Sequence, residues 1–374
     1  MKKILYLYSD AGGCHKIAAE AIAETIDQKS KEKLAHKIID MWTLGSKLQS
    51  SFFGEESYKR AMKYYPGLYG LGFWLVNNKV LSSLVSKLNY LSLGRGLRKL
   101  IKDDRPDLIV STHPLVNYAL IRTLKDLDLY GKIPTVNSEL ELVTVHHFWV
   151  EKGFDLTIVP TEEAKEIFIK RGYPPEKIKL VGFPVRQKFL NELPDKAILR
   201  KELGLSEDKF TVLIMGGIEG VGYIYEMVRE AENINREIQL IVCAGKNTRL
   251  YDRLSNMKVG FPLKVYRYTE EIPKLMRASD LLLTKAGAAS VSEAIASDLP
   301  MIIFSYVPGQ ESGTPKWVER NGFGKYVNRP KAIVKTINDW IENGKINELK
   351  KNISRFKNPK VTYDIVDLIL SLFG

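Results

Sequence analysis

Short runs of apolar residues alternate along this chain with stretches in which apolar residues recur every three or four positions. Runs of about four to six apolar residues are typical of buried strands, and the longer spacing is typical of amphipathic helices. Regular alternation of the two predicts a parallel sheet with helices on both faces. In the first half, the predicted strands are Ile4–Tyr8, His36–Asp40, Asp107–Ser111, Pro134–Asn137 and Leu156–Pro160, and the first predicted helix is Lys16–Ile26.

A second alternating set begins after the segment Val181–Arg186. Two such sets predict an α/β fold of two tandem Rossmann-like domains that face each other across a cleft. We expect the domains to span residues 1–183 and 184–358, followed by a terminal helix in residues 359–374 (Val361 to Phe373). The predicted strands of the second set are Thr211–Met215, Gln239–Ala244, Leu263–Tyr266, Leu281–Thr284 and Met301–Ser305.

Residues 45–105 interrupt the first set with a long, glycine-punctuated and largely helical insertion. Residues 41–102 contain ten Lys or Arg residues but only two acids, Glu55 and Glu56, so they hold eight of the twelve net positive charges of the chain. Basic residues interleaved with aromatics suit an anionic lipid surface. The alternative is a solvated basic face over an aromatic core, and no nucleic-acid-binding signature accompanies the charge. The aromatics are Trp42, Phe52, Phe53, Tyr58, Tyr64, Tyr65, Tyr69, Phe73 and Trp74.

The composition bounds the class of protein. A chain of 374 residues with 45% hydrophobic residues is long for one core and typical of two soluble domains. No apolar run reaches the roughly 18 residues that a membrane-spanning helix needs. Cys14 and Cys243 alone suggest no disulfide framework, so a cytoplasmic location is expected.

Two small-residue turns follow predicted strands and precede predicted helices. Residues 9–15 (SDAGGCH) follow Ile4–Tyr8, and residues 284–294 (TKAGAASVSEA) follow Leu281–Leu283. Such turns place backbone N–H groups and the positive end of a helix dipole where an anion can bind. Two such turns in opposite halves of the chain predict a cleft between two domains. A nucleotide-linked substrate would be held by one domain and attacked from the side of the other.

His15 is the candidate catalytic residue because it lies on the first of these turns. An imidazole titrates near neutral pH and can serve as a general base. The alternative is a histidine that caps the helix or packs in the core.

Three further patterns leave their interpretation open. The loop Gly216–Gly222 is glycine-rich, but it matches neither a P-loop nor a dinucleotide-binding pattern, so it is either a ligand loop or a plain turn. Glu293 can accept hydrogen bonds from ribose hydroxyls or be a solvated helix residue. Gln310 and Glu311 can bind sugar hydroxyls or belong to an ordinary polar loop. No cluster of His, Cys, Asp and Glu has metal-ligand spacing.

These residues together make the chain resemble the diacylglycerol glycosyltransferases, that is, plant-type monogalactosyldiacylglycerol synthases and bacterial processive diacylglycerol glucosyltransferases. More distantly, the chain is similar to the lipid-linked N-acetylglucosaminyltransferase of peptidoglycan synthesis. The resemblance covers nearly the whole chain. The motifs that carry it are residues 12–15 (GGCH), 65–69 (YPGLY), 111–114 (STHP), 142–146 (LVTVH), 182–186 (GFPVR), 216–222 (GGIEGVG), 284–294 and 308–311 (PGQE).

The resemblance implies two facing Rossmann-like domains of the GT-B type. The first domain would bind the lipid acceptor, the second would bind the UDP-sugar, and the terminal helix would cross back onto the first. His15 matches the family's base, and Glu293 matches its ribose-binding acid. The other donor-binding residues implied are Gly13, Arg186 near the diphosphate, Gly217, Glu219, Tyr268, Thr269 and Ile272 at the uracil, Lys285, Gly287 and Ala288 at the diphosphate, and Gln310 and Glu311 at the hexose.

The acceptor and the membrane are assigned to the first domain. The residues implied there are Lys59, Arg60, Lys63, Tyr64, Tyr65, Tyr69, Phe73, Trp74, His113 and Glu141. Three positions depart from the family pattern: Cys14 and Arg267 stand where Gly is usual, and Glu141 stands where Asp is usual. These departures concern fine geometry and the choice of donor sugar.

The expected function is inverting transfer of a hexose from UDP-glucose or UDP-galactose to diacylglycerol, without metal or other cofactor. The protein would act as a peripheral enzyme on the inner face of the cell membrane, with anionic phospholipid as a partner and no nucleic acid. Two alternatives stay open: a peptidoglycan-type N-acetylglucosaminyltransferase that acts on a polyprenyl-diphosphate-linked sugar, and a non-catalytic module that binds lipid or nucleotide.

Overall fold

The computed structural model describes residues 1–10, 13–30, 32–46, 54–192 and 194–373, without the side chains of Glu55, Tyr58, Lys59, Met62 and Lys63. The chain divides into two compact units. Unit 1 comprises Met1–Gln187, Val307–Gly313 and Lys360–Gly374, and unit 2 comprises Lys188–Tyr306 and Thr314–Pro359. Residues 307–313 therefore group with the first unit, although the sequence places them in the second half of the chain.

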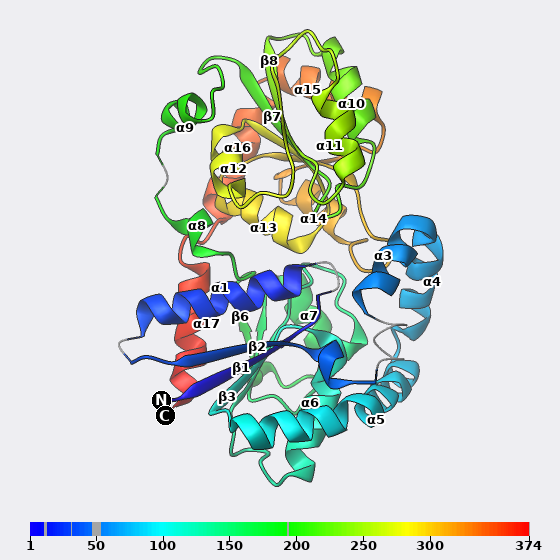
Figure 1. The fold of residues 1–374 in the computed structure, drawn as a ribbon, viewed down its shortest axis with the longest axis vertical. Helices are drawn as coiled ribbons and strands as arrows, with labels where there is room; N and C mark the ends of the chain where they lie inside the picture. The colour runs from blue at the N-terminus through cyan, green and yellow to red at the C-terminus, as the bar shows by residue number, and fades with distance from the viewer. Residues whose placement is uncertain (11–12, 31, 47–53, 193, 374) are drawn as a thin grey trace. The chain divides into compact units, whose positions relative to one another are not determined.

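The described strands of unit 1 form a six-stranded parallel sheet in the order β2-β1-β3-β4-β5-β6 (Figure 1). Because every strand runs the same way, the turns that follow the strands all lie at one edge of the sheet. The strands are β1 (Lys3–Tyr8), β2 (Ala35–Asp40), β3 (Leu108–Ser111), β4 (Thr135–Ser138), β5 (Leu156–Val159) and β6 (Ile178–Leu180).

Helices cover both faces of this sheet. Side chains of α5 and α6 pack on Leu5, Leu7 and Ile109 in one hydrophobic core, while the terminal helix α17 packs against α1 (Figure 1). The expected return of the terminal helix onto the first unit is confirmed. The helices of unit 1 are α1 (Cys14–Lys29), α3 (Glu55–Tyr64), α4 (Pro66–Val76), α5 (Lys79–Asp104), α6 (Pro114–Asp126), α7 (Glu162–Lys170) and α17 (Val361–Leu370), with the 3-10 turns η1 (Met41–Leu44), η2 (His147–Trp149), η3 (Pro175–Lys177) and η5 (Ser371–Phe373).

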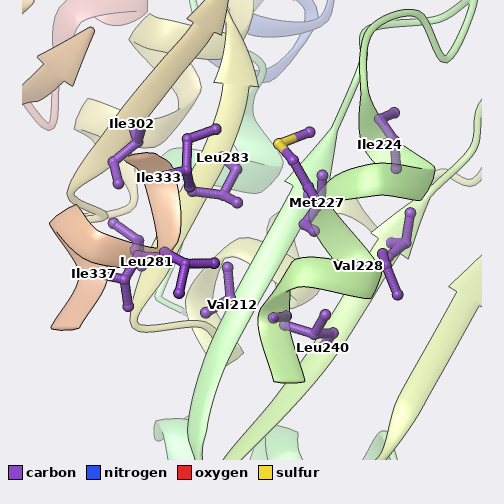
Figure 2. Close-up of a cluster of buried hydrophobic side chains, with 14 of the residues drawn as sticks. Val212, Ile224, Met227, Val228, Leu240, Leu281, Leu283, Ile302, Ile333 and Ile337 are labelled. Atoms are coloured by element: carbon purple, nitrogen blue, oxygen red, sulfur yellow. The ribbon is translucent and has the colours of Figure 1, made fainter. Parts of the chain in front are cut away.

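Unit 2 has the same design. Its described strands form a six-stranded parallel sheet in the order β12-β11-β10-β7-β8-β9. Figure 2 shows how α10 and α15 pack on one face of this sheet, where Met227 and Ile333 meet strand residues such as Leu283. The strands are β7 (Phe210–Met215), β8 (Ile238–Cys243), β9 (Leu263–Tyr266), β10 (Leu281–Lys285), β11 (Met301–Ser305) and β12 (Gly324–Tyr326).

Helices α10 (Ile224–Glu230), α11 (Thr248–Ser255), α12 (Ile272–Ala278), α13 (Ala288–Ala296) and α14 (Thr314–Arg320) connect successive strands of unit 2, as a parallel sheet requires. The unit also contains α9 (Lys196–Glu202) before its first strand, α15 (Pro330–Glu342) and α16 (Lys345–Phe356) after its last, and the 3-10 turn η4 (Ala231–Asn233); α8 (Gln187–Leu190) links the two units. Two tandem α/β sheets with parallel strands are what the sequence predicts, and each predicted strand is found. The prediction omits β6 and β12, which have three residues each and are too short to show an apolar pattern.

Asp280 anchors the beginning of β10. Its carboxylate accepts hydrogen bonds from Lys196 Nζ at 2.7 Å, Arg200 at 2.6 Å and the Thr211 N–H at 2.8 Å. Burial raises the pKa of this carboxyl, but Lys196, Thr211 and Arg200 together lower it below its ordinary value. The ion pairs therefore stabilise the folded state once the carboxyl is charged.

We predict that Asp280→Asn lowers the free energy of unfolding by about 2 kcal/mol at pH 7, because the buried Arg200 guanidinium loses its charged partner. Because the pKa of Asp280 is depressed in the folded state, the difference should shrink as pH falls below the usual range of an aspartate. Urea denaturation measures the free energy of unfolding, and the control is Asp208→Asn, which changes an exposed aspartate. Equal stability of the two variants at pH 7 would contradict the prediction.

Candidate active site

His15 lies in the first turn of α1, directly after the loop that leaves β1. Gly13 begins the helix with φ of 78°, a left-handed conformation that glycine adopts without strain. Ala11 and Gly12 of the same loop lie outside the described residues. The sequence thus brings an imidazole to the edge of the sheet between β1 and its neighbour β3.

The His15 ring is held by the turn after β3. Its Nδ1 atom lies 2.6 Å from the Thr112 carbonyl oxygen, and the Thr112 hydroxyl donates to the His15 carbonyl at 3.0 Å. A carbonyl oxygen can only accept, so Nδ1 carries the proton and the lone pair of the neutral ring is on Nε2. Burial lowers the pKa of His15 to about 4, although the bond to Thr112 opposes that shift. The ring is therefore neutral at physiological pH, as a base must be.

A second imidazole adjoins the first. The His113 ring meets the His15 ring edge to face, with 4.5 Å between centroids. His113 Nδ1 accepts from the Leu115 N–H at the start of α6, which leaves the proton of this ring on Nε2. Burial and then His15 lower the pKa of His113 well below its usual value. The pair presents one proton acceptor and one proton donor side by side.

Trp149 is a third member of this site that the sequence analysis missed. It is buried in η2, and its ring centroid lies 6.3 Å from that of His15. Buried polar bonds fix it: Asn137 donates to the Trp149 carbonyl at 3.0 Å and accepts from Asn117 at 3.2 Å. Its Nε1–H has no hydrogen-bond partner within the described part of the chain. In the sequence, Asn117 and Asn137 interrupt otherwise apolar helix and strand patterns. These two buried polar residues could have indicated a functional site here.

Glu141 and the 307–313 loop form a separate polar group in unit 1. The Gln310 Nε2 atom donates to Glu141 Oε1 at 2.8 Å, and the Tyr69 hydroxyl donates to Gln310 Oε1 at 3.3 Å. Glu311 is buried, and its carboxylate accepts from the Val307 N–H at 2.7 Å. Gln310 and Glu311 therefore have partners within unit 1, and binding of sugar hydroxyls by them stays a prediction.

The donor-site residues predicted for unit 2 lie at the C-terminal edge of its sheet. Lys285 ends β10, and Gly287 precedes α13, whose first N–H groups receive no side-chain cap. Gly217, in the loop after β7, lies beside Lys285, because a Cβ atom at Gly217 would be 3.7 Å from Lys285 Cε. The structure therefore brings the loop after β7 and the turn after β10 together around Lys285 and the N-terminus of α13. This arrangement suits a phosphate.

The remaining predicted donor residues are placed as follows. Glu293 is 6% exposed on α13, so it is not the solvated helix residue of the alternative reading. Glu219 is half-buried in the loop after β7. Tyr268 is exposed, Thr269 accepts from the Glu271 N–H and Ile272 begins α12, all just after β9. Ala288 is the first residue of α13, and Arg186 belongs to unit 1, half-buried.

The insertion forms α3, α4 and α5, and several large apolar side chains are exposed on α4 and α5. Side chains of Leu71 and Trp74 on α4 and of Leu84 and Leu88 on α5 are each more than half exposed. Tyr64 and Tyr65 are exposed as well, whereas Tyr69 and Phe73 face inward and Arg60 pairs with Glu56 on the surface. The side chains of Lys59 and Lys63 lie outside the described residues. The apolar stripe of α5 was missed, although spacing of four residues between Val80, Leu84 and Leu88 is its signal.

Two negative findings concern the described residues only. No three His, Cys, Asp or Glu side chains among them are grouped as a metal ion would need. Within the same residues, no helix combines the length and the apolar character required to span a bilayer.

Comparison of the structure with solved structures identifies the fold. MurG of Acinetobacter baumannii matches with a TM-score of 0.63 and 13% identity, over 99% of this chain and 100% of that one. Alr3699/HepE of Anabaena, solved in complex with UDP, matches with a TM-score of 0.58 and 16% identity, again over 99% and 100% of the two chains. The fold is thus the GT-B fold, as expected.

Comparison of the sequence identifies the family. The family model for monogalactosyldiacylglycerol synthase matches residues 15–185, and that for the C-terminal domain of glycosyltransferase family 28 matches residues 211–313. Monogalactosyldiacylglycerol synthase of Spinacia oleracea is 31% identical over 375 residues, covering 98% of this chain and 71% of the relative. Synthase 1 of Arabidopsis thaliana is 29% identical over 98% of this chain and 70% of its own length. The chain therefore belongs to the monogalactosyldiacylglycerol synthase family and is a hexosyltransferase.

Proposed function

We propose that this enzyme transfers a hexose from a UDP-sugar to the free hydroxyl of diacylglycerol, with inversion at the anomeric carbon. The names of its relatives support the lipid acceptor and a galactosyl product. The observation that carries the proposal is the bond from His15 Nδ1 to the Thr112 carbonyl, because it leaves a neutral Nε2 atom able to take a proton.

Unit 1 binds the acceptor in this proposal. The acceptor oxygen donates its proton to His15 Nε2 and accepts a hydrogen bond from His113 Nε2–H, so the paired rings orient one hydroxyl. The buried Trp149 N–H supplies a further donor, which suits an ester carbonyl oxygen of the lipid.

Unit 2 binds the UDP part of the donor. The diphosphate lies at the start of α13, where the uncapped N–H groups after Gly287 and the Lys285 ammonium meet its charge. Glu293 binds the ribose hydroxyls, and residues 268–272 bind uracil. Fixed positive groups then stabilise the leaving group, and the reaction needs no metal ion.

The step balances without a co-reactant. The acceptor oxygen forms a bond to the anomeric carbon as the bond from that carbon to the phosphate oxygen breaks. UDP leaves with the electron pair of that bond, and His15 holds the proton until it passes to solvent.

The membrane surface is proposed as the partner of α4 and α5. Exposed leucines and Trp74 lie on these helices, and the exposed cations Lys87, Arg95 and Lys99 occupy α5. An apolar face bordered by cations inserts between anionic headgroups and delivers the enzyme to its lipid acceptor. The enzyme is then a peripheral protein on the inner face of the cell membrane.

We predict that purified enzyme releases UDP from UDP-galactose or UDP-glucose only when diacylglycerol is added, and that chelation of metal ions leaves the rate unchanged. Mass spectrometry and sugar analysis should identify a hexosyl-diacylglycerol with β configuration if the donor is α-linked. Transfer to a polyprenyl-diphosphate sugar instead would establish the peptidoglycan-type alternative. UDP binding without any transfer would establish the non-catalytic one.

We predict that His15→Ala lowers turnover by roughly 10²- to 10⁴-fold, the usual contribution of a general base. Binding of UDP should persist, because the variant leaves unit 2 intact. In the wild type, kcat/KM should fall only as pH drops toward about 4, since protonation of His15 removes its lone pair. His36→Ala, whose ring pairs with Asp27, is the control. Retained turnover in His15→Ala would exclude His15 as the base.

We predict that the double variant Leu84→Asp/Leu88→Asp binds vesicles of phosphatidylglycerol and phosphatidylcholine roughly 100-fold more weakly, because two apolar anchors become charged. Activity on detergent-dispersed diacylglycerol should remain. The control is Ile198→Asp, which changes an exposed apolar residue of α9 in unit 2. Vesicle sedimentation gives the affinities, and equal binding by both variants would argue against membrane docking through α5.

A further inference from the structure

Helix α4 presents two different faces. Leu68, Leu71 and Trp74 are exposed on one side, while Tyr69, Gly70 and Phe73 lie on the other. A helical repeat of 3.6 residues places positions 69, 70 and 73 together, so the division follows from the sequence itself. The outer face is the one proposed to meet lipid, and the inner face meets protein.

The inner face of α4 contacts the loop Val307–Gly313. Gly70 approaches Pro308 so closely that a Cβ atom there would lie 2.6 Å from Pro308 Cβ. Gly309, with φ of 84°, lies against the Phe73 ring in the same way. The loop is further held by the bond from the Gly313 N–H to Thr144 Oγ1 at 3.0 Å. Residues distant in sequence therefore form one packed element within unit 1.

The Gln310 carboxamide is fixed at both ends in this element. Tyr69 donates to its oxygen, and Glu141 accepts from its nitrogen. A carboxylate oxygen accepts and cannot donate, so the NH₂ group must face Glu141 and the carbonyl must face Tyr69. The Tyr69 hydroxyl stays protonated, because burial, Glu141 and Glu311 raise its pKa well above the usual value. The amide therefore has one orientation.

A second carboxyl lies behind Glu141. Glu139 is 1% exposed and its Oε1 atom accepts from the Glu141 N–H at 2.6 Å. Burial, followed by the charge of Glu141, raises the pKa of Glu139 well above its ordinary value. Of these two neighbouring carboxyls, Glu141 is the one whose oxygen accepts from Gln310.

We propose that Tyr69 and Glu141 are positioning residues that orient Gln310 toward the donor hexose and so set which sugar the enzyme selects. This inference rests on the proposed function and on the contact between Gln310 and the donor hexose that the family resemblance implies. Gln310 is half-exposed, and its two bonds leave one N–H and one carbonyl lone pair for a ligand. A sugar hydroxyl both donates and accepts, so a carboxamide in one orientation can distinguish an axial from an equatorial hydroxyl.

The inference changes the assignment of two residues. The sequence analysis placed Tyr69 and Glu141 with the acceptor and the membrane. Their hydrogen bonds connect them instead to the loop that carries Gln310. The choice of sugar then depends on α4, whose outer face is proposed to rest on lipid.

The test measures kcat/KM for UDP-galactose and UDP-glucose with detergent-dispersed diacylglycerol in Tyr69→Phe, Gln310→Ala and the double variant. Tyr69→Phe should change the ratio of the two values roughly two- to tenfold, the effect of one neutral hydrogen bond. In the Gln310→Ala background, the same substitution should have no further effect on the ratio, since Tyr69 acts through Gln310. Glu141→Gln, which can accept or donate, should change the ratio roughly 10-fold or more.

Tyr363→Phe is the matched control, because the Tyr363 hydroxyl also donates to a glutamine oxygen, Gln28 Oε1, at 3.3 Å. It should leave the donor ratio unchanged. If Tyr69→Phe or Gln310→Ala also leaves the ratio unchanged, or if Tyr69→Phe has the same effect with and without Gln310, the inference is overturned while the proposed function stands. A wild-type enzyme that transfers hexose from neither donor overturns the proposed function and the inference with it.

Discussion

The chemistry of unit 1 depends on one hydrogen bond between two turns, from His15 Nδ1 to the Thr112 carbonyl. That bond requires β1 and β3 to be neighbours in a parallel sheet, so that the turns following them meet at the same edge. It also requires His15 in the first turn of α1, one residue after the strand-to-helix loop has ended. A backbone carbonyl then selects the tautomer, and burial keeps the ring neutral. The start of α1 and the pairing of β1 with β3 thus decide which nitrogen of His15 carries the proton.

Unit 2 uses the same edge of its own parallel sheet for a different purpose. The turns after β7 and β10 bring Gly217 and Lys285 together next to the uncapped start of α13. In the proposed function, the buried imidazole of unit 1 is the base and this turn of unit 2 binds the diphosphate, the two parts that glycosyl transfer needs. Similar sheets can carry different chemistry because the loops, and not the strands, supply the reacting groups.

The sequence predicted the architecture well because parallel strands buried on both faces are continuous apolar runs, as Leu281–Leu283 illustrates. It also indicated His15, Gly287 and Glu293 as candidate site residues, since each lies on or just after a turn that follows such a run, and their roles stay predictions. It could not predict the partners that long-range folding supplies. Gln310 lies 241 residues from Tyr69 and 169 residues from Glu141, and no local pattern indicates that the three meet. Trp149 was missed for the same reason, because its place beside His15 depends on Asn117 and Asn137.

The state of the His15 imidazole is the central claim of this account, and NMR of the ¹⁵N-histidine-labelled protein measures it directly. The ring nitrogen shifts report which nitrogen carries the proton at each pH. The account predicts a neutral ring with its proton on Nδ1 at pH 7, and protonation of Nε2 only near pH 4. A His15 ring protonated on Nε2 at pH 7, or one that titrates near the ordinary histidine pKa of about 6.5, would contradict it.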